Sequence, residues 1–184
     1  MVGYEGIIVD QTQRKEKELK LKKAHDFHTN LIQSSIDGIV AADRKGYLMI
    51  YNDGAENIYG YTRQEALSGM HVTQLYFEGD ARRVKALINA PEFGGEGRLV
   101  NYELEVRDKQ GRKVPIMLSA ALLRENGREI GTVGFFKDMR QIKQLESELI
   151  KRFAFEHNLI QSSIDAIAAS DDDGNIIVFN QSAE

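Results

Sequence analysis

The sequence predicts an α+β fold: a five-stranded antiparallel sheet with helices over one face, flanked by amphipathic connector helices. Three observations support this prediction. Two short apolar segments open the central region, a stretch interrupted by glycines follows, and three longer strand-like segments close the region. A hydrophobic content of 42% is ordinary for a globular domain.

The first two strands are predicted at residues 36–43 and 47–52, joined by polar turn residues into a hairpin. After residue 52 the strand period disappears and glycines separate short helical pieces. Residues 79–90 place Val84 and Ile88 on one side of a longer helix. Strands are then predicted at 98–108, 112–125 and 128–138, the last two joined by Asn126-Gly127, a strong hairpin signal.

The chain repeats itself at a constant offset of 128 residues, since residues 3–56 recur at 131–184 (131 − 3 = 128). Residues 30–56 and 158–184 are identical at fifteen of 27 positions, and the period matches a small domain plus a connecting helix. We therefore expect a fragment of a tandem array. Its parts are the last strand of a preceding unit (1–10), a connector helix (11–30), a complete domain (31–138), a second connector helix (139–158) and the truncated start of a following unit (159–184).

The connectors show helical rather than strand periodicity. Ile142, Leu145 and Leu149 follow the 3 and 4 spacing of an apolar stripe, with charged residues between them. We expect these three side chains to mediate dimerisation through a short coiled coil. The alternative is a helix that packs on its own domain.

Several motifs of the central region carry a family resemblance through their order and spacing. These are Asp37-Gly38 at the first strand, Asn52 after the second, Ala55-Glu56 and Gly60-Tyr61 in the helical stretch, Glu65, the glycines of the final strand, and Asp138 at its exit. With them, residues 31–138 resemble a PAS sensor domain. The resemblance implies a sheet whose last strand lies beside its first, and a cavity between sheet and helices.

The resemblance also implies a function. We expect a sensory or signal-transmission module of a larger bacterial-type signalling protein, such as a sensor histidine kinase of a two-component system, acting in the cytoplasm. The connector helices would relay the state of a ligand or partner. A non-sensing spacer or dimerisation module in a tandem array is the alternative.

Strand alternation predicts which side chains line the cavity, although a filled core remains an alternative. The predicted lining residues are Ile39, Ala41, Ile58, Val84, Ile88, Met117, Ser119, Val133 and Phe135.

Asp138 follows the last strand and starts the connector, so we expect its carboxylate to cap that helix and Arg140 to pair with it. Movement of the strand would then reach the connector through this signal relay. A plain capped helix without switching is the competing interpretation.

Cofactors are not expected, although an unidentified small molecule stays open. Cysteine is absent, which removes disulfides and the cysteine that flavin photoreceptors of this family use. Haem needs an axial histidine, and helix 79–90 has none. His71 precedes that helix and is expected to be a surface or hydrogen-bonding residue rather than a metal ligand.

Enzymatic residues are not apparent. His25-Asp26 and His28 loosely resemble a phosphoacceptor box, but Asn30 stands where proline should be and no glycine-rich ATP-binding segment exists. These residues are therefore expected on a solvated helix face, and no metal site is expected. We predict a regulatory fragment rather than an enzyme, whose full-length parent could carry a kinase or cyclase domain.

Expected partners are a second copy of the chain and neighbouring PAS and output domains. A net charge of −4 argues against nucleic acid, and the lack of a long apolar run argues against membrane contact by this fragment. The strand at residues 4–10 of one chain is expected to pair with the hairpin at 164–180 of another, giving a swapped or head-to-tail assembly. Fraying of both ends is the alternative.

Overall fold

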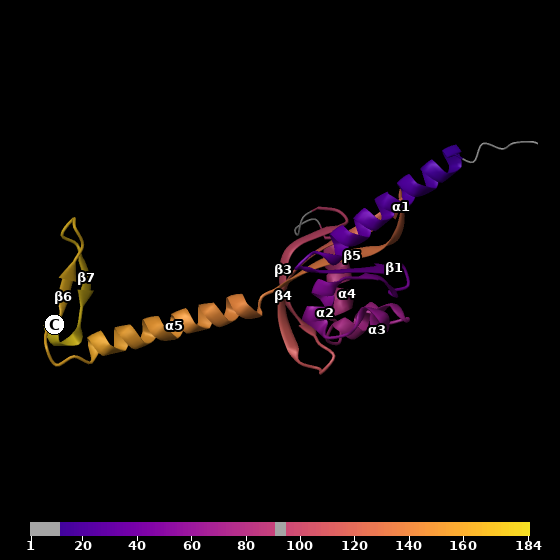
Figure 1. Cartoon of the computed structure of the whole chain (residues 1–184). Helices are drawn as coiled ribbons and strands as arrows, with labels where there is room; N and C mark the ends of the chain where they lie inside the picture. The colour runs from indigo at the N-terminus through magenta and orange to yellow at the C-terminus, as the bar shows by residue number, and fades with distance from the viewer. Residues whose placement is uncertain (1–11, 91–94) are drawn as a thin grey trace, which may run out of the picture. The chain divides into compact units, whose positions relative to one another are not determined.

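The computed structural model describes residues 12–90 and 95–184, which divide at Asp138 into two compact units (Figure 1). The strand predicted at residues 1–10 lies outside the described residues. In the first unit, helix α1 (Thr12–Gln33) precedes the β1 (Gly38–Asp43) and β2 (Leu48–Tyr51) hairpin. The connector helix thus runs to Gln33, three residues beyond its predicted end.

The hairpin turn is fixed by the side chain of Asp43. Its Oδ1 accepts hydrogen bonds from the backbone N–H groups of Lys45 (2.8 Å) and Tyr47 (2.9 Å). Such a local bond replaces the strand ladder where the chain reverses. A bulge between Ala41 and Ala42 shifts the register of the two strands.

A layer of short helices follows: α2 (Asp53–Tyr59), α3 (Arg63–Leu67), the 3₁₀ helix η1 (Val72–Leu75) and α4 (Asp80–Ile88). Each begins where a side chain or glycine permits it. Asn52 caps α2, and Thr62 with Glu65 forms a capping box on α3. The 3₁₀ helix was not predicted, since its four residues are too few to show a period.

Strands β3 (Arg98–Arg107), β4 (Lys113–Glu125) and β5 (Arg128–Asp138) complete the sheet. The strand order is β2-β1-β5-β4-β3 with every pair antiparallel, so the last strand lies beside the first, as predicted. Asn126 and Gly127 both adopt positive φ (50° and 78°), which the tight β4–β5 turn requires.

The core lies between one sheet face and the helical layer (Figure 1). Val40 and Ala42 of β1, Leu118 and Ala120 of β4, and Phe136 of β5 are buried there. Their neighbours in sequence therefore face the other side of the sheet.

Gly134 explains why Phe136 rather than Phe135 points inward. A Cβ on Gly134 would lie 2.8 Å from the Phe136 ring, so the glycine leaves the space that this ring occupies. Phe136 is 2% exposed, whereas Phe135 is 45% exposed. The sequence analysis assigned the opposite face of β5 to the interior, and this prediction was wrong.

The second unit contains α5 (Arg140–Gln161), β6 (Ala168–Ser170), β7 (Ile176–Phe179) and a 3₁₀ turn (Gln181–Ala183). Leu145 and Leu149 of the predicted dimerisation stripe are exposed, and Ile142 is half-buried. The N-cap of α5 is Met139, and Asp138 is the last residue of β5, so the predicted cap position was one residue too early.

Candidate functional site

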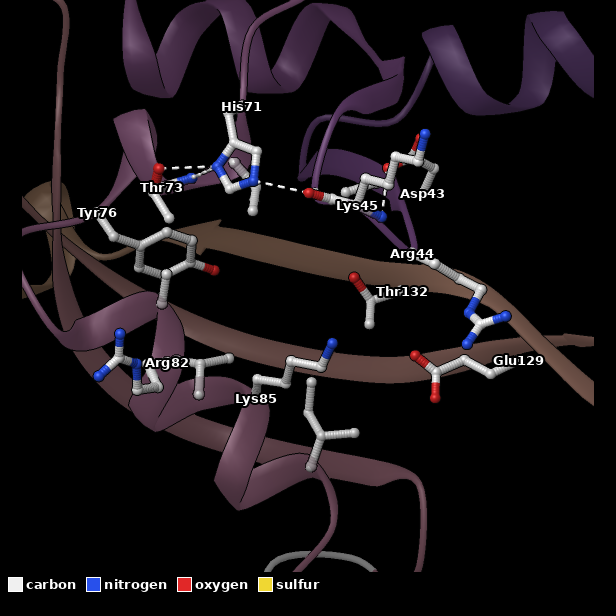
Figure 2. Close-up of a pocket in the computed structure, with 16 residues that line it drawn as sticks. Asp43, Arg44, Lys45, His71, Thr73, Tyr76, Arg82, Lys85, Glu129 and Thr132 are labelled. Carbon is white, nitrogen blue, oxygen red and sulfur yellow. Dashed lines mark hydrogen bonds between the residues drawn. The ribbon is translucent and has the colours of Figure 1, made fainter.

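A cavity of about 270 Å³ opens where the β1–β2 turn, η1, α4 and the start of β5 meet (Figure 2). One wall is apolar and comes from one face of α4. Ala81, Val84 and Ile88 recur there at helical spacing, and Val72 of η1 also lines the cavity. Pockets for small molecules have this mainly apolar lining with a few polar groups.

His71 ties the turn to η1. Its Nε2 lies 2.8 Å from the carbonyl oxygen of Lys45, and its Nδ1 lies 2.8 Å from Thr73 Oγ1 and 3.3 Å from Thr73 N. Because Nδ1 accepts from the Thr73 N–H, the proton belongs on Nε2, which donates to Lys45. The ring acts as the hydrogen-bonding residue that the sequence predicted.

Backbone bonds reinforce this link. The N–H of Val72 donates to the carbonyl of Gly46 at 2.8 Å, and the N–H of Leu48 donates to Met70 at 3.0 Å. The turn that carries Arg44 and Lys45 is thus held on both sides, so the rim of the cavity has a defined shape.

Tyr76 presents a polar group inside the cavity. The residue is 5% exposed, and its hydroxyl points into the space between α4 and the sheet (Figure 2). No hydrogen bond of this hydroxyl occurs within residues 12–90 and 95–184. Burial, and then the charge of Asp80, raises the Tyr76 pKa well above its usual range, so the group stays a neutral donor.

The hydroxyl of Tyr59 is a buried group that lacks a partner among the described residues. Tyr59 is fully buried, and its hydroxyl makes no hydrogen bond within the described part of the chain. Burial raises its pKa well above the usual range, with smaller contributions from Tyr76 and Tyr51. Such groups are unusual in a packed core, because an unsatisfied buried hydroxyl is destabilising.

A small void of about 40 Å³ lies deeper between the sheet and α4. Its wall shares Tyr76, Val84 and Ile88 with the open cavity. The interior is thus largely filled, and most of the free volume lies toward the mouth.

Three of the nine predicted lining residues face the helical layer: Ile58, Val84 and Ile88. Of these, Val84 and Ile88 line the open cavity. The other six predicted residues are strand residues whose register places them on the opposite face of the sheet. Of these six, Val133 also borders the inner void. They are Ile39, Ala41, Met117, Ser119, Val133 and Phe135.

The polar lining was missed by the sequence reasoning. Arg44 and Lys45 come from the turn, Arg82 and Lys85 from α4, and Thr132 from β5. The one available signal was the i, i+3 spacing of two cations beside the apolar stripe of α4.

The remaining predicted candidates are not part of this site. His25, Asp26 and His28 are exposed on α1, as expected for a solvated helix face. In the described part of the chain no three His, Cys, Asp or Glu side chains gather as a metal site would require. The same residues include no helix with the length and apolarity to cross a bilayer.

A family model described as the PAS fold matches residues 27–139, more than half of the chain. The chain belongs to the PAS family. The cavity therefore lies in a sensory domain of a family of regulatory, non-catalytic modules. No curated protein is similar enough to count as a match.

Solved PAS structures show the same fold. A PAS domain from Colwellia psychrerythraea aligns with a TM-score of 0.55 and 25% identity, covering 64% of this chain and 98% of that one. The PAS domain of an HTR-like protein from Haloarcula marismortui aligns with a TM-score of 0.54 and 18% identity, covering 67% of this chain and 98% of that one. The PAS domain of a LuxR-family transcriptional regulator from Burkholderia thailandensis was solved in complex with ethanol. It aligns with a TM-score of 0.51 and 16% identity, covering 60% of this chain and 96% of that one.

Proposed function

We propose that this PAS domain is a sensory and signal-transmission module of a larger cytoplasmic signalling protein, such as a sensor histidine kinase, and that it responds to a small molecule. The observation that carries the proposal is the Tyr76 hydroxyl, which points into an open cavity and has no partner in the described part of the chain. A ligand in the cavity would supply the missing hydrogen bond.

Native mass spectrometry of the 184-residue chain tests this function. We expect a retained small-molecule mass that is lost in Ala81→Leu, because Ala81 lines the cavity and a larger side chain fills it. Ala86→Leu makes the same chemical change on the exposed face of α4 and should retain the mass. Absence of any retained mass from the wild-type chain, or its equal retention in both variants, would contradict the proposal.

A spacer or dimerisation module is the second candidate. The observation that favours it is the small size of the inner void, about 40 Å³, which leaves the core nearly filled. On this alternative the chain carries no ligand, and its role lies in the connectors.

Self-association is proposed through the α5 stripe. Leu145 is 58% exposed and Leu149 is 69% exposed, and both recur with Ile142 on one side of the helix. A second copy of the stripe would bury them in a homodimer. Sedimentation of Leu145→Glu/Leu149→Glu should show monomers, and an unchanged state would exclude the stripe as the interface.

A swapped or head-to-tail pairing of residues 1–10 with the C-terminal hairpin is proposed as a further contact. The hairpin exposes Ile176 (67%) and Phe179 (46%), which a strand of another chain could cover. Deleting residues 1–10 should reduce self-association, whereas an unchanged oligomer would argue for separate ends.

Asp138 and Arg140 are proposed to relay ligand state from β5 to α5, because they flank the junction of strand and helix. Hydrogen exchange of the first-turn amides of α5 should respond to ligand in the wild type and lose that response in Asp138→Ala. An undiminished response would remove Asp138 from the relay.

A further inference from the structure

The charges around the cavity are unbalanced. Its lining includes four cationic side chains, from Arg44, Lys45, Arg82 and Lys85, and two carboxylates, from Asp43 and Glu129. The opening therefore has an excess of positive charge in a chain whose net charge is −4.

One of the two carboxylates is already engaged. Asp43 accepts two backbone hydrogen bonds through Oδ1, which hold the turn. Within residues 12–90 and 95–184, no ion pair links Glu129 to Arg44 or Lys85, although all three border the same opening (Figure 2). The four cationic side chains therefore exceed the two carboxylates by two charges (4 − 2 = 2).

Arg82 and Lys85 are both on α4, and Figure 2 shows the Lys85 ammonium in the open space and the Arg82 guanidinium pointing away from it. Neither side chain forms an ion pair within the described part of the chain. An anion bound beside Lys85 would gain charge-assisted hydrogen bonds.

The cavity is not suited to a bare inorganic anion. Its wall behind the cations consists of Val72, Val84 and Ile88, which offer no hydrogen bonds. Tyr76 and Thr132 add hydroxyls on the inner side, where Figure 2 shows them facing the open space. A matching ligand has an anionic head, a short apolar body and a polar atom near Tyr76.

We propose that this cavity binds a small organic anion, with a carboxylate or phosphate head near Arg44 and Lys85 and an apolar body against Val84 and Ile88. The proposal rests on the sensory function proposed above and specifies the chemical class of its ligand. The hydrogen bond between His71 and the Lys45 carbonyl oxygen holds the cationic turn in place beside the head group.

Matched pairs of probes test the charge requirement. Carboxylates from acetate to octanoate, with phenylacetate, are titrated into the 184-residue chain by calorimetry beside the alcohols of equal size, and phenyl phosphate is the phosphate probe. We expect at least one anion to bind about tenfold more tightly than its alcohol, because a charged hydrogen bond adds that much affinity. Comparison of phenylacetate with phenyl phosphate shows which head group the cavity prefers.

Variants locate the binding. Lys85→Gln should weaken the best anion about five- to tenfold, and Tyr76→Phe should weaken it while leaving the fold intact, because the hydroxyl has no protein partner in the described part. Lys137→Gln removes the same charge from an exposed position of β5 outside the cavity and should leave the affinity unchanged.

Two results would overturn the ligand class. If alcohols bind as tightly as their anions, the sensory function stands and the preference for anions is wrong. If no probe binds and native mass spectrometry finds no retained mass, the sensory function fails with it. Equal weakening by Lys85→Gln and Lys137→Gln would show only a general charge effect and would also overturn the proposed site.

Discussion

The β1–β2 hairpin of the complete PAS domain and the β6–β7 hairpin of the second unit are two copies of one local structure in different surroundings. Asn52 Oδ1 accepts from the Ile39 N–H at 2.6 Å, and Asn180 Oδ1 accepts from Ile167 at 2.7 Å. Both hairpins have a bulge at the same repeat position. Residues 128 apart therefore reproduce the same hydrogen bonds.

The two copies differ in burial. Leu48 is 6% exposed and Tyr51 is fully buried, whereas their counterparts Ile176 and Phe179 are 67% and 46% exposed. Local geometry thus forms from short-range bonds alone, while burial depends on the helical layer and the three later strands. A two-stranded hairpin without such cover is marginally stable.

Replacing the aromatic residue at equivalent positions should give the largest difference between the copies. Tyr51→Ala should lower the free energy of unfolding of the complete domain by about 3–5 kcal/mol, because it empties a buried aromatic site. Phe179→Ala should change it by less than about 0.5 kcal/mol. Urea unfolding followed by far-UV circular dichroism measures both, and similar values for the two variants would mean that burial does not separate the copies.

Much of this contrast was accessible from the sequence, but the sheet faces were not. Strand limits followed from apolar runs between turn residues, and the predicted 128–138 strand matches β5. The prediction of the buried face was wrong because consecutive residues are both apolar, as in Ile39-Val40 and Phe135-Phe136. Hydrophobic alternation therefore does not distinguish the two faces of the strand. Only packing, through the space beside Gly134, decides between them.

The cavity could be predicted only from its helical side. Val84 and Ile88 repeat at helical spacing within one short segment, so their common face was visible. Arg44 and Lys85 are 41 positions apart (85 − 44 = 41), and nothing in their local sequence indicates that they border one opening. Long-range proximity of exposed polar residues leaves no periodic signal.

Removing the asparagine that both copies share should give the next largest difference in stability between the two units. The Asn52 amide also donates to the carbonyls of Ile32 and Asp37, each at 3.0 Å. Asn52→Ala would leave these buried groups without partners and should destabilise the complete domain by about 3 kcal/mol.

The matched variant Asn180→Ala removes the equivalent bonds to Ile160 and Asp165. Hydrogen exchange should show faster exchange at the Ile167 amide and no change in β1. Loss of protection in β1 would mean that the two units do not unfold independently.

The two hairpins also differ by one Cβ atom at an equivalent position. Gly38 of the covered hairpin corresponds to Ala166 of the exposed one. A Cβ at Gly38 would lie 2.9 Å from Ile58 Cδ1 and 3.2 Å from the Ala55 backbone. Gly38→Ala should therefore cost about 1–2 kcal/mol through overpacking, whereas Ala166→Gly should change the stability of the complete domain by less than about 0.5 kcal/mol.

Thermal unfolding of both variants checks this expectation. A neutral Gly38→Ala variant would show that α2 can move away from β1. The repeat would then tolerate alanine at this position with or without the helical layer.

The smallest expected effect comes from an acid-sensitive contact of the complete domain, between α3 and the β3–β4 turn. Lys109 Nζ lies 2.6 Å from Glu65 Oε1, and the Thr62 N–H donates to Oε2 at 2.9 Å. The hydrogen bond from Lys109, followed by that from Thr62, lowers the Glu65 pKa from its usual 4.5 to about 2. The unfolded carboxylate takes up its proton first, so this contribution is complete above about pH 4.5 and is lost as the pH falls toward 2.

Glu65→Gln should therefore flatten the fall of the urea midpoint between about pH 4.5 and pH 2 while leaving the second unit unaffected. Glu78→Gln, which removes an exposed carboxylate without an ion pair in the described part of the chain, is the matched control. Because exposed pairs contribute little, the difference should be small and should diminish in high salt. If Glu65→Gln and Glu78→Gln give the same pH profile, the contact between α3 and the β3–β4 turn does not contribute to acid sensitivity, and the domain's response to acid must arise from other carboxylates.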